Sequence, residues 1–106
     1  MKKTVSISYD EWFDSILKKD RKFAIDYIKT AFEEATDAEG RKTLLSAIKQ
    51  VAKAQGISKV AAVAGIRRES LSRALSSKGN PRIDTLLSII NAIGLELTVK
   101  PKKVSS

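Results

Sequence analysis

Gly65 separates two short amphipathic segments in the second half of the chain, residues 57–64 and 67–76. Both segments carry apolar side chains at helical spacing, and glycine accepts the positive φ angle of a tight turn without a steric penalty. Small or apolar residues stand wherever such a helix pair would cross or bury its inner face: Val60, Ala61, Ile66, Leu71 and Leu75. Two short helices joined in this way form the frame of a helix-turn-helix.

The rest of the chain is predicted to be mostly helical as well. Apolar periodicity predicts further helices over residues 10–17, 21–35, 36–55 and 84–92. Asp10 and Asp20 are expected to cap the first two, and Thr36 with Glu39 has the spacing of a capping box for the third. The following aromatic residues are assigned to the core rather than to a ligand site: Trp12, Phe13, Phe23, Tyr27 and Phe32.

Residues 4–9 and 95–100 differ from the helical segments, because apolar and polar residues alternate strictly in both. This alternation is typical of a half-buried strand. A lone strand cannot satisfy its own backbone groups. The two segments are therefore expected to pair with each other, within one chain or across a dimer.

Charge is distributed unevenly along the 106 residues, whose net charge is +8. Residues 1–40 hold seven Lys/Arg and nine Asp/Glu, whereas residues 41–106 hold thirteen Lys/Arg and three acids. Such asymmetry indicates two surfaces with two different partners. The basic half suits a polyanion such as DNA, although surface lysines that only keep the protein soluble would give a similar total.

The composition argues against catalysis and against a cofactor. The chain has no cysteine and no histidine, so it lacks disulfides, thiolate metal ligands and the commonest general base. Ser70 and Ser72 have no histidine partner, and the chain has no glycine-rich phosphate loop. We therefore expect no enzyme activity, no cofactor and no metal.

The sequence also argues against an acidic metal site and against a membrane or secreted protein. Asp10, Glu11 and Asp14 form an acidic cluster, for which helix capping and solvation are a better interpretation than a metal site. No apolar run approaches the ~20 residues of a membrane span, and no secretory signal pattern follows Met1. A cytoplasmic protein without membrane contact is the expectation.

Several segments resemble a known family. Residues 60–75, "VAAVAGIRRESLSRAL", followed by "GNPRIDTLLSIINAIGLEL", resemble the Cro/repressor-type (Xre) helix-turn-helix. The segment from Leu44 to Val99 is similar to the antitoxin branch of that family, the HigA-like "addiction module antidote" proteins. The N-terminal "SYDEWFDSILKKDRKFAIDYIKTAFEEA" also resembles the acidic helical segment that precedes the motif in that branch, so the resemblance covers nearly the whole chain.

The resemblance implies a mostly α fold: a lambda-repressor-like helix-turn-helix bundle with an N-terminal helical extension and short terminal β-strands. Residues 1–40 would form the strand and the acidic extension, a candidate toxin-binding or dimer surface. Residues 41–99 would form the DNA-binding domain, and residues 100–106 a basic tail.

The resemblance also implies roles for individual residues. Base-reading candidates lie on the first turns of the second helix: Arg68, Glu69, Ser72 and Arg73. Candidates for the DNA backbone lie beside them and in the following loop: Arg67, Ser70, Lys78, Asn80 and Arg82. Two positions depart from the family pattern, because Arg67 and Arg82 stand where Ser-type helix caps are usual.

The implied function is that of an antitoxin and transcriptional repressor, which binds double-stranded operator DNA as a homodimer and autoregulates a toxin–antitoxin operon. Residues 85–99 would form the dimer surface. The antitoxin would also neutralise a small basic RelE/HigB-like toxin through acidic candidates: Asp10, Glu11, Asp14, Glu33 and Glu34. Two alternatives remain, a stand-alone or phage-type regulator without a toxin and a protein-interaction module that binds an acidic partner.

Overall fold

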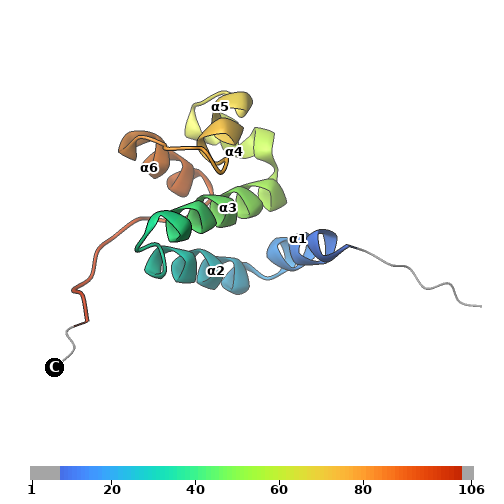
Figure 1. Cartoon of the computed structure of the whole chain (residues 1–106). Coiled ribbons are helices and arrows are strands. Elements are labelled where there is room, and N and C mark those ends of the chain that lie inside the picture. The colour runs from blue at the N-terminus through green and yellow to red at the C-terminus, as the bar shows by residue number, and fades with distance from the viewer. Residues whose placement is uncertain (1–7, 104–106) are drawn as a thin grey trace, which may run out of the picture.

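Six helices form the described part of the chain in the computed structural model, which describes residues 8–103. They are α1 (Tyr9–Lys19), α2 (Arg21–Glu33), α3 (Ala38–Gln55), α4 (Ile57–Ala64), α5 (Arg68–Ala74) and α6 (Ile83–Ala92). The long helix α3 lies in the middle, with α1 and α2 on one side and α4, α5 and α6 on the other (Figure 1). The predicted mostly helical fold is confirmed.

The N-terminal caps differ from the prediction for two helices. Ser8, not Asp10, caps α1: its Oγ accepts a hydrogen bond from the Glu11 N–H at 3.1 Å, and Glu11 Oε1 accepts one from the Ser8 N–H at 3.2 Å. Asp10 already lies inside the first turn, where its charge favours the helix N-terminus. Asp20 caps α2 as predicted, through a hydrogen bond from the Phe23 N–H at 2.9 Å.

The predicted capping box at the start of α3 is also wrong. Asp37 caps this helix, and its Oδ1 accepts a hydrogen bond from the Gly40 N–H at 2.8 Å. Thr36 is instead part of the turn that closes α2, where its N–H donates to the Glu34 carbonyl oxygen at 2.9 Å. The turn therefore places the cap one residue later than the sequence spacing indicated.

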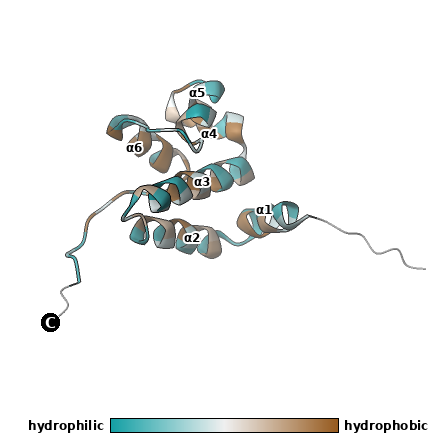
Figure 2. Ribbon diagram, viewed as in Figure 1, coloured by the Kyte–Doolittle hydropathy of each residue, from teal (hydrophilic) through white to brown (hydrophobic). Residues whose placement is uncertain are grey.

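One apolar core joins all six helices, and none of its members within residues 8–103 is polar. Its largest fully buried side chains come from α3 and from the side formed by α4, α5 and α6: Ile48, Val60, Leu71, Leu75, Ile89 and Ile90. The residues predicted for the inner faces of α4 and α5 belong to this core, although Ile66 is only half-buried. In Figure 2, by contrast, the outermost helix, α5, is coloured largely hydrophilic.

The aromatic residues are less buried than predicted. Phe13 belongs to the core, but Trp12 is 48% exposed and Phe23 is 39% exposed. Trp12 is exposed because α2 and α3 cover only one face of α1. Phe23 lies at the start of α2, where its ring meets that of Phe13 but stays partly in solvent. Assigning Trp12 and Phe23 to the core was therefore wrong.

The predicted C-terminal strand is absent, since residues 95–103 have no regular secondary structure. This tail runs beside α2 instead: an Arg21 Nη2 donates to the Gly94 carbonyl oxygen at 3.3 Å, and Lys100 Nζ lies 3.1 Å from Glu33 Oε2. Leu95 packs against the core rather than on a strand partner. Residues 4–7 of the other predicted strand lie outside the described residues, while Ser8 and Tyr9 begin α1.

Candidate nucleic-acid interface

A glycine turn connects α4 to α5, as the sequence predicted. Gly65 adopts the left-handed conformation, with φ 74° and ψ 28°. A Cβ atom at this position would meet nothing within 4 Å, so the backbone angle rather than lack of space favours glycine. The Ile66 N–H donates to the Ala61 carbonyl oxygen at 3.0 Å, which closes α4 and directs the chain into α5. The two helices share buried residues on their inner faces and leave the outer face of α5 open to solvent.

The outer face of α5 is basic, and the positive charges of its arginines are not balanced by ion pairs with acidic side chains of the described residues. Arg67, Arg68, Glu69 and Arg73 are all exposed. Among the residues that the structure describes, no ion pair involves any of these four. Ser70 and Ser72 are half-buried, so Ser72 is less prominent on this face than the sequence suggested. Three guanidinium groups are thus available to an external anion.

The structure brings four of the predicted residues together in one groove. Ser70 and Arg73 from α5 and Lys78 and Asn80 from the following loop line an open groove of about 540 Å³. Ser76 and Thr85, which the sequence analysis did not single out, line the same groove. The Thr85 hydroxyl adds hydrogen-bonding capacity beside the two cations, whereas the Ser76 hydroxyl already donates to the Arg73 carbonyl oxygen at 2.9 Å.

Arg67 and Arg82 occupy the N-cap positions of α5 and α6, and neither side chain makes a capping hydrogen bond. The physical reason is that an arginine side chain has only donors and cannot replace the hydroxyl acceptor that is usual at this position. Arg82 Nε lies 3.6 Å from Asp84 Oδ1, but both side chains are more than 70% exposed. An ion pair in that setting is weak, so it leaves Arg82 free to exchange partners.

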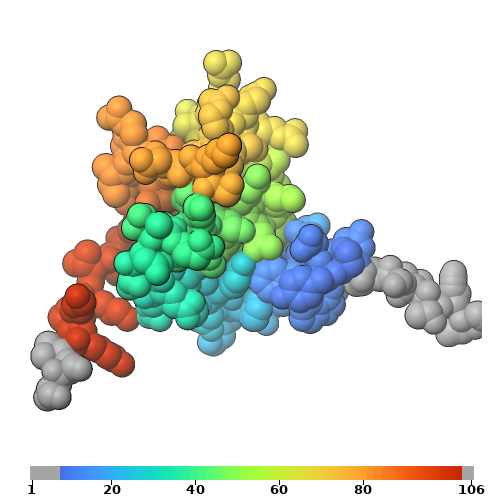
Figure 3. All heavy atoms as spheres, viewed as in Figure 1, coloured from blue at the N-terminus to red at the C-terminus, as the bar shows by residue number. Residues whose placement is uncertain are grey.

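The segment 67–82 therefore concentrates positive charge at one end of the molecule. It contains five Lys/Arg and one acid, Glu69. Figure 3 shows this segment, in yellow and orange, projecting at the top of the view, away from α1 in blue. A convex basic helix flanked by a basic groove suits an extended polyanion.

The predicted partner-binding acids fall into two separate groups. Asp10, Glu11 and Asp14 lie on α1, while Glu33 and Glu34 lie where α2 ends. The first group lies beside the C-terminal half of α3, and the second leads into the start of α3. Gln50 and Lys53, which line a hollow with Asp10 and Asp14, lie 12 and 15 residues after Ala38, so the two groups are roughly 20 Å apart along the axis of α3.

Some of these carboxylates already have partners. Asp14 pairs with Lys18 at 3.0 Å, and Glu33 pairs with Lys100 at 3.1 Å. Within residues 8–103, no set of three or more His, Cys, Asp or Glu side chains is placed to hold a metal ion. In the same range, no helix combines the length and the hydrophobicity required to cross a bilayer.

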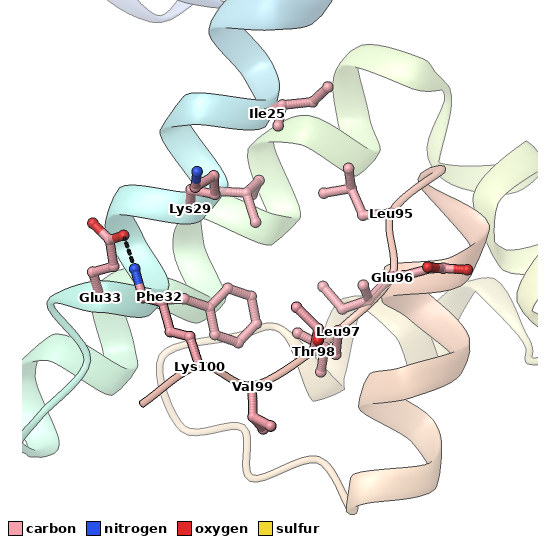
Figure 4. Close-up of a pocket in the computed structure, with 12 residues that line it drawn as sticks. Ile25, Lys29, Phe32, Glu33, Leu95, Glu96, Leu97, Thr98, Val99 and Lys100 are labelled. Atoms are coloured by element: carbon pink, nitrogen blue, oxygen red, sulfur yellow. Dashed lines mark hydrogen bonds and ion pairs between the residues drawn. The ribbon is translucent and has the colours of Figure 1, made fainter. Parts of the chain in front are cut away.

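A second concave feature lies between α2 and the tail (Figure 4). It has a volume of about 450 Å³, and its apolar wall includes Ile25, Phe32, Leu95 and Leu97. The Glu33–Lys100 ion pair closes one end. The wall of this groove is mainly apolar and the charged residues that line it are of both signs, which distinguishes it from the basic groove beside α5.

The chain is similar to a known family and to a bacterial protein. A family model described as "Probable addiction module antidote protein" matches residues 11–101. An uncharacterized protein of Haemophilus influenzae (strain Rd) is 33% identical over 76 residues, which are 72% of this chain and 78% of the relative. No solved structure matches the chain.

Proposed function

The chain belongs to the family of probable addiction module antidote proteins, and we propose that it is a DNA-binding antitoxin that represses its own toxin–antitoxin operon. The proposal assigns α4 and α5 to an Xre-type helix-turn-helix of the HigA-like branch. The observation that carries it is the outer face of α5, where Arg67, Arg68 and Arg73 are exposed and have no acidic partner among the described residues.

In this proposal α5 enters the major groove and reads base edges. The planar forks of Arg68 and Arg73 suit the O6 and N7 acceptors of guanine, and Glu69 suits the N4 donor of cytosine. Ser72 lies between these residues and takes a smaller part, because it is half-buried. Helix-turn-helix proteins read DNA with these first turns of the second helix.

The neighbouring polar residues hold the DNA backbone. Lys78 and Asn80 line the groove beside α5 together with Ser70, so all three approach the same phosphate path. Arg67 and Arg82 flank this path from the two helix starts. Contacts of this kind fix the register of the protein on the duplex and carry little base preference.

We propose that the antitoxin acts as a homodimer. An exposed apolar strip crosses α4 and α6, with Val63 63% exposed, Ile83 67% and Leu87 44%. A second copy that covers this strip by two-fold symmetry would present two α5 helices to half-sites about 34 Å apart. The strip overlaps the candidate dimer region 85–99 at Leu87.

We propose that the toxin is a small basic RelE/HigB-like protein, bound by the helices that precede α3. Residues 1–40 carry nine acids against seven bases, whereas the remainder is strongly basic. Opposite charges on the two partners would speed and orient their encounter. The proposed activity consists of binding, without a catalytic step.

The DNA-binding half is tested by titrating the purified chain onto the DNA upstream of its own gene at several salt concentrations. Binding through several phosphates should weaken steeply as salt rises, with each contact adding about 0.9 to the slope of log affinity against log salt. A flat salt dependence and equal affinity for unrelated DNA would contradict the proposal and would favour an interaction module with an acidic protein partner.

The toxin-binding half is tested separately, by co-expressing the chain with the product of the adjacent reading frame. Joint purification and relief of growth arrest are expected. If the chain binds its upstream DNA but neither binds nor neutralises that product, it is a stand-alone regulator.

A further inference from the structure

An unusually large share of the aromatic side chains gathers at one place on α1 and α2. Five of the six aromatic residues of the chain take part: Tyr9, Trp12, Phe13, Phe23 and Tyr27. The Phe13 ring is the hub, with its centroid 5.9 Å from that of Tyr9, 5.8 Å from that of Phe23 and 4.9 Å from that of Tyr27. Trp12 joins through Tyr9, at 5.7 Å.

Only the inner part of this cluster contributes to the core. Phe13 is 8% exposed, but Tyr9 is 69%, Trp12 48% and Phe23 39% exposed. Three neighbouring aromatic side chains on a surface are unfavourable in water, since each Å² of exposed apolar surface costs about 25 cal/mol. Tyrosine and tryptophan are also the residues that most often dominate the energy of protein interfaces. The exposed rings therefore mark a contact surface.

The charges around these rings restrict which partner can cover them. Asp10 and Glu11 are exposed beside Tyr9 and Trp12, and within residues 8–103 neither carboxylate forms an ion pair. Of the nearby bases, Lys18 pairs with Asp14 and Lys22 pairs with Asp26, while Lys53 of α3 lines the same hollow as Asp10 and Asp14. DNA phosphates would be repelled by this surface. A second copy meeting it by two-fold symmetry would bring like charges together.

We propose that this aromatic–acidic patch, made of Tyr9, Trp12 and Phe23 with Asp10 and Glu11, binds arginine side chains on a basic protein. A guanidinium group stacks on an aromatic face through its π electrons and also forms a two-pronged salt bridge with a carboxylate. Rings and carboxylates side by side offer both interactions to one arginine. This inference rests on the proposed function for the identity of the basic protein, which is the toxin.

Trp12 allows a direct test, because it is the only tryptophan of the chain. The full chain is labelled with 5-fluorotryptophan and mixed with the unlabelled product of the adjacent reading frame, so that the fluorine spectrum reports residue 12 alone. The resonance should shift on complex formation and stay in place when the upstream DNA is added. A complex that leaves the resonance unchanged overturns the patch and leaves the antitoxin function intact.

Substitutions sharpen the test. Trp12→Ala and Asp10→Asn should each weaken the complex with the adjacent product. For Trp12→Ala the dissociation constant should rise about tenfold or more. Val99→Ala and Glu39→Gln are matched controls, since both residues are exposed and lie outside the patch, and their affinities should stay within about twofold of the unmodified chain. Equal affinity of all four variants would overturn the proposal, and unchanged melting curves would exclude misfolding as the cause of any loss.

A further experiment distinguishes failure of the aromatic–acidic patch from failure of the proposed antitoxin function. If the adjacent product does not bind at all, the toxin half of the function fails, and a short peptide of alternating arginine and alanine replaces it. The patch predicts that this peptide shifts the Trp12 resonance at lower concentration than its lysine counterpart. No shift with either peptide overturns the patch as well.

Discussion

Gly79 lies directly against the carbonyl oxygen of Ala74, so that a Cβ atom at residue 79 would overlap the last turn of α5. The Gly79 N–H also donates to the Ser76 carbonyl oxygen at 2.8 Å. These contacts set the path of the loop that carries Lys78 and Asn80 beside α5. The absence of a side chain at residue 79 is therefore part of the candidate interface.

Gly79→Ala should lower the free energy of unfolding by about 1–3 kcal/mol, because the added methyl group meets backbone rather than a flexible side chain. DNA affinity should fall as well, since Lys78 and Asn80 move with the loop. Thermal melting and DNA titration measure the two effects. Ser77→Ala, at an exposed position of the same loop, is the control and should change neither.

Arg67→Ser should change the stability of the fold and the affinity for DNA in opposite directions. Serine at this N-cap position can accept a hydrogen bond from the first turn of α5, which Arg67 does not, so stability should rise by about 0.5–1 kcal/mol. DNA affinity should fall, and the salt slope should decrease by about one contact. A variant that is more stable and binds DNA as tightly as before would show that Arg67 touches no phosphate.

The apolar strip on α4 and α6 predicts a change in oligomeric state. Leu87→Lys should convert the dimer into a monomer, because the substitution places a charge in the centre of the strip at a position already 44% exposed. Light scattering after size exclusion measures this directly. Ser46→Lys, at an exposed position of α3 outside the strip and outside residues 85–99, should leave the dimer intact.

Tyr27 predicts a loss of stability in alkaline solution. Burial raises the pKa of its phenol above the ordinary value of 10.0, and the neighbouring Tyr9 adds to the shift. In the unfolded chain the phenol ionises at its ordinary pKa, so above about pH 10 the folded state holds more protons and stability falls as pH rises. Below about pH 10 the Tyr27 phenol is protonated in both states, and its contribution to the free energy of unfolding is fully present.

Unfolding measured from pH 8 to pH 11 checks this, with Tyr27→Phe as the comparison. The fall in stability that Tyr27 causes at high pH should be missing in the variant. The variant also lacks the hydrogen bond from the Tyr27 hydroxyl to Gln50, but this loss is the same at every pH. Identical slopes for the two proteins would show that Tyr27 titrates alike in the folded and unfolded states.

The helices were predictable because each buries one face at a spacing of 3.6 residues, and the glycine turn because residue 65 needs a positive φ angle. Asp20 was correctly predicted as the cap of α2. The caps of α1 and α3 were not predictable, because two possible acceptors stand close together at each of these helix starts. Ser8 and Asp10, like Thr36 and Asp37, offer oxygens within two residues. The path of the preceding turn decides between them.

Long-range neighbours account for the other differences. The alternation of residues 95–100 describes a chain with one apolar side, but it does not reveal that α2 rather than a strand lies next to that side. Likewise, the periodicity of α1 does not show that only one of its faces is covered, so Trp12 was assigned to the core. The groove beside α5 depends on the Gly79–Ala74 contact, which leaves no pattern in the sequence.

We propose that the outer face of α5 reads DNA bases, and the Arg68→Ala variant is the sharpest test of this claim. Affinities of the unmodified chain and of Arg68→Ala are measured for the upstream operator and for copies changed at single base pairs. For Arg68→Ala we expect a loss of about 1–3 kcal/mol in binding free energy and a relaxed base preference at one position in each half-site. Arg41→Ala, at an exposed position of α3, should change neither. An equal loss of affinity on every sequence, or no loss at all, would contradict the claim.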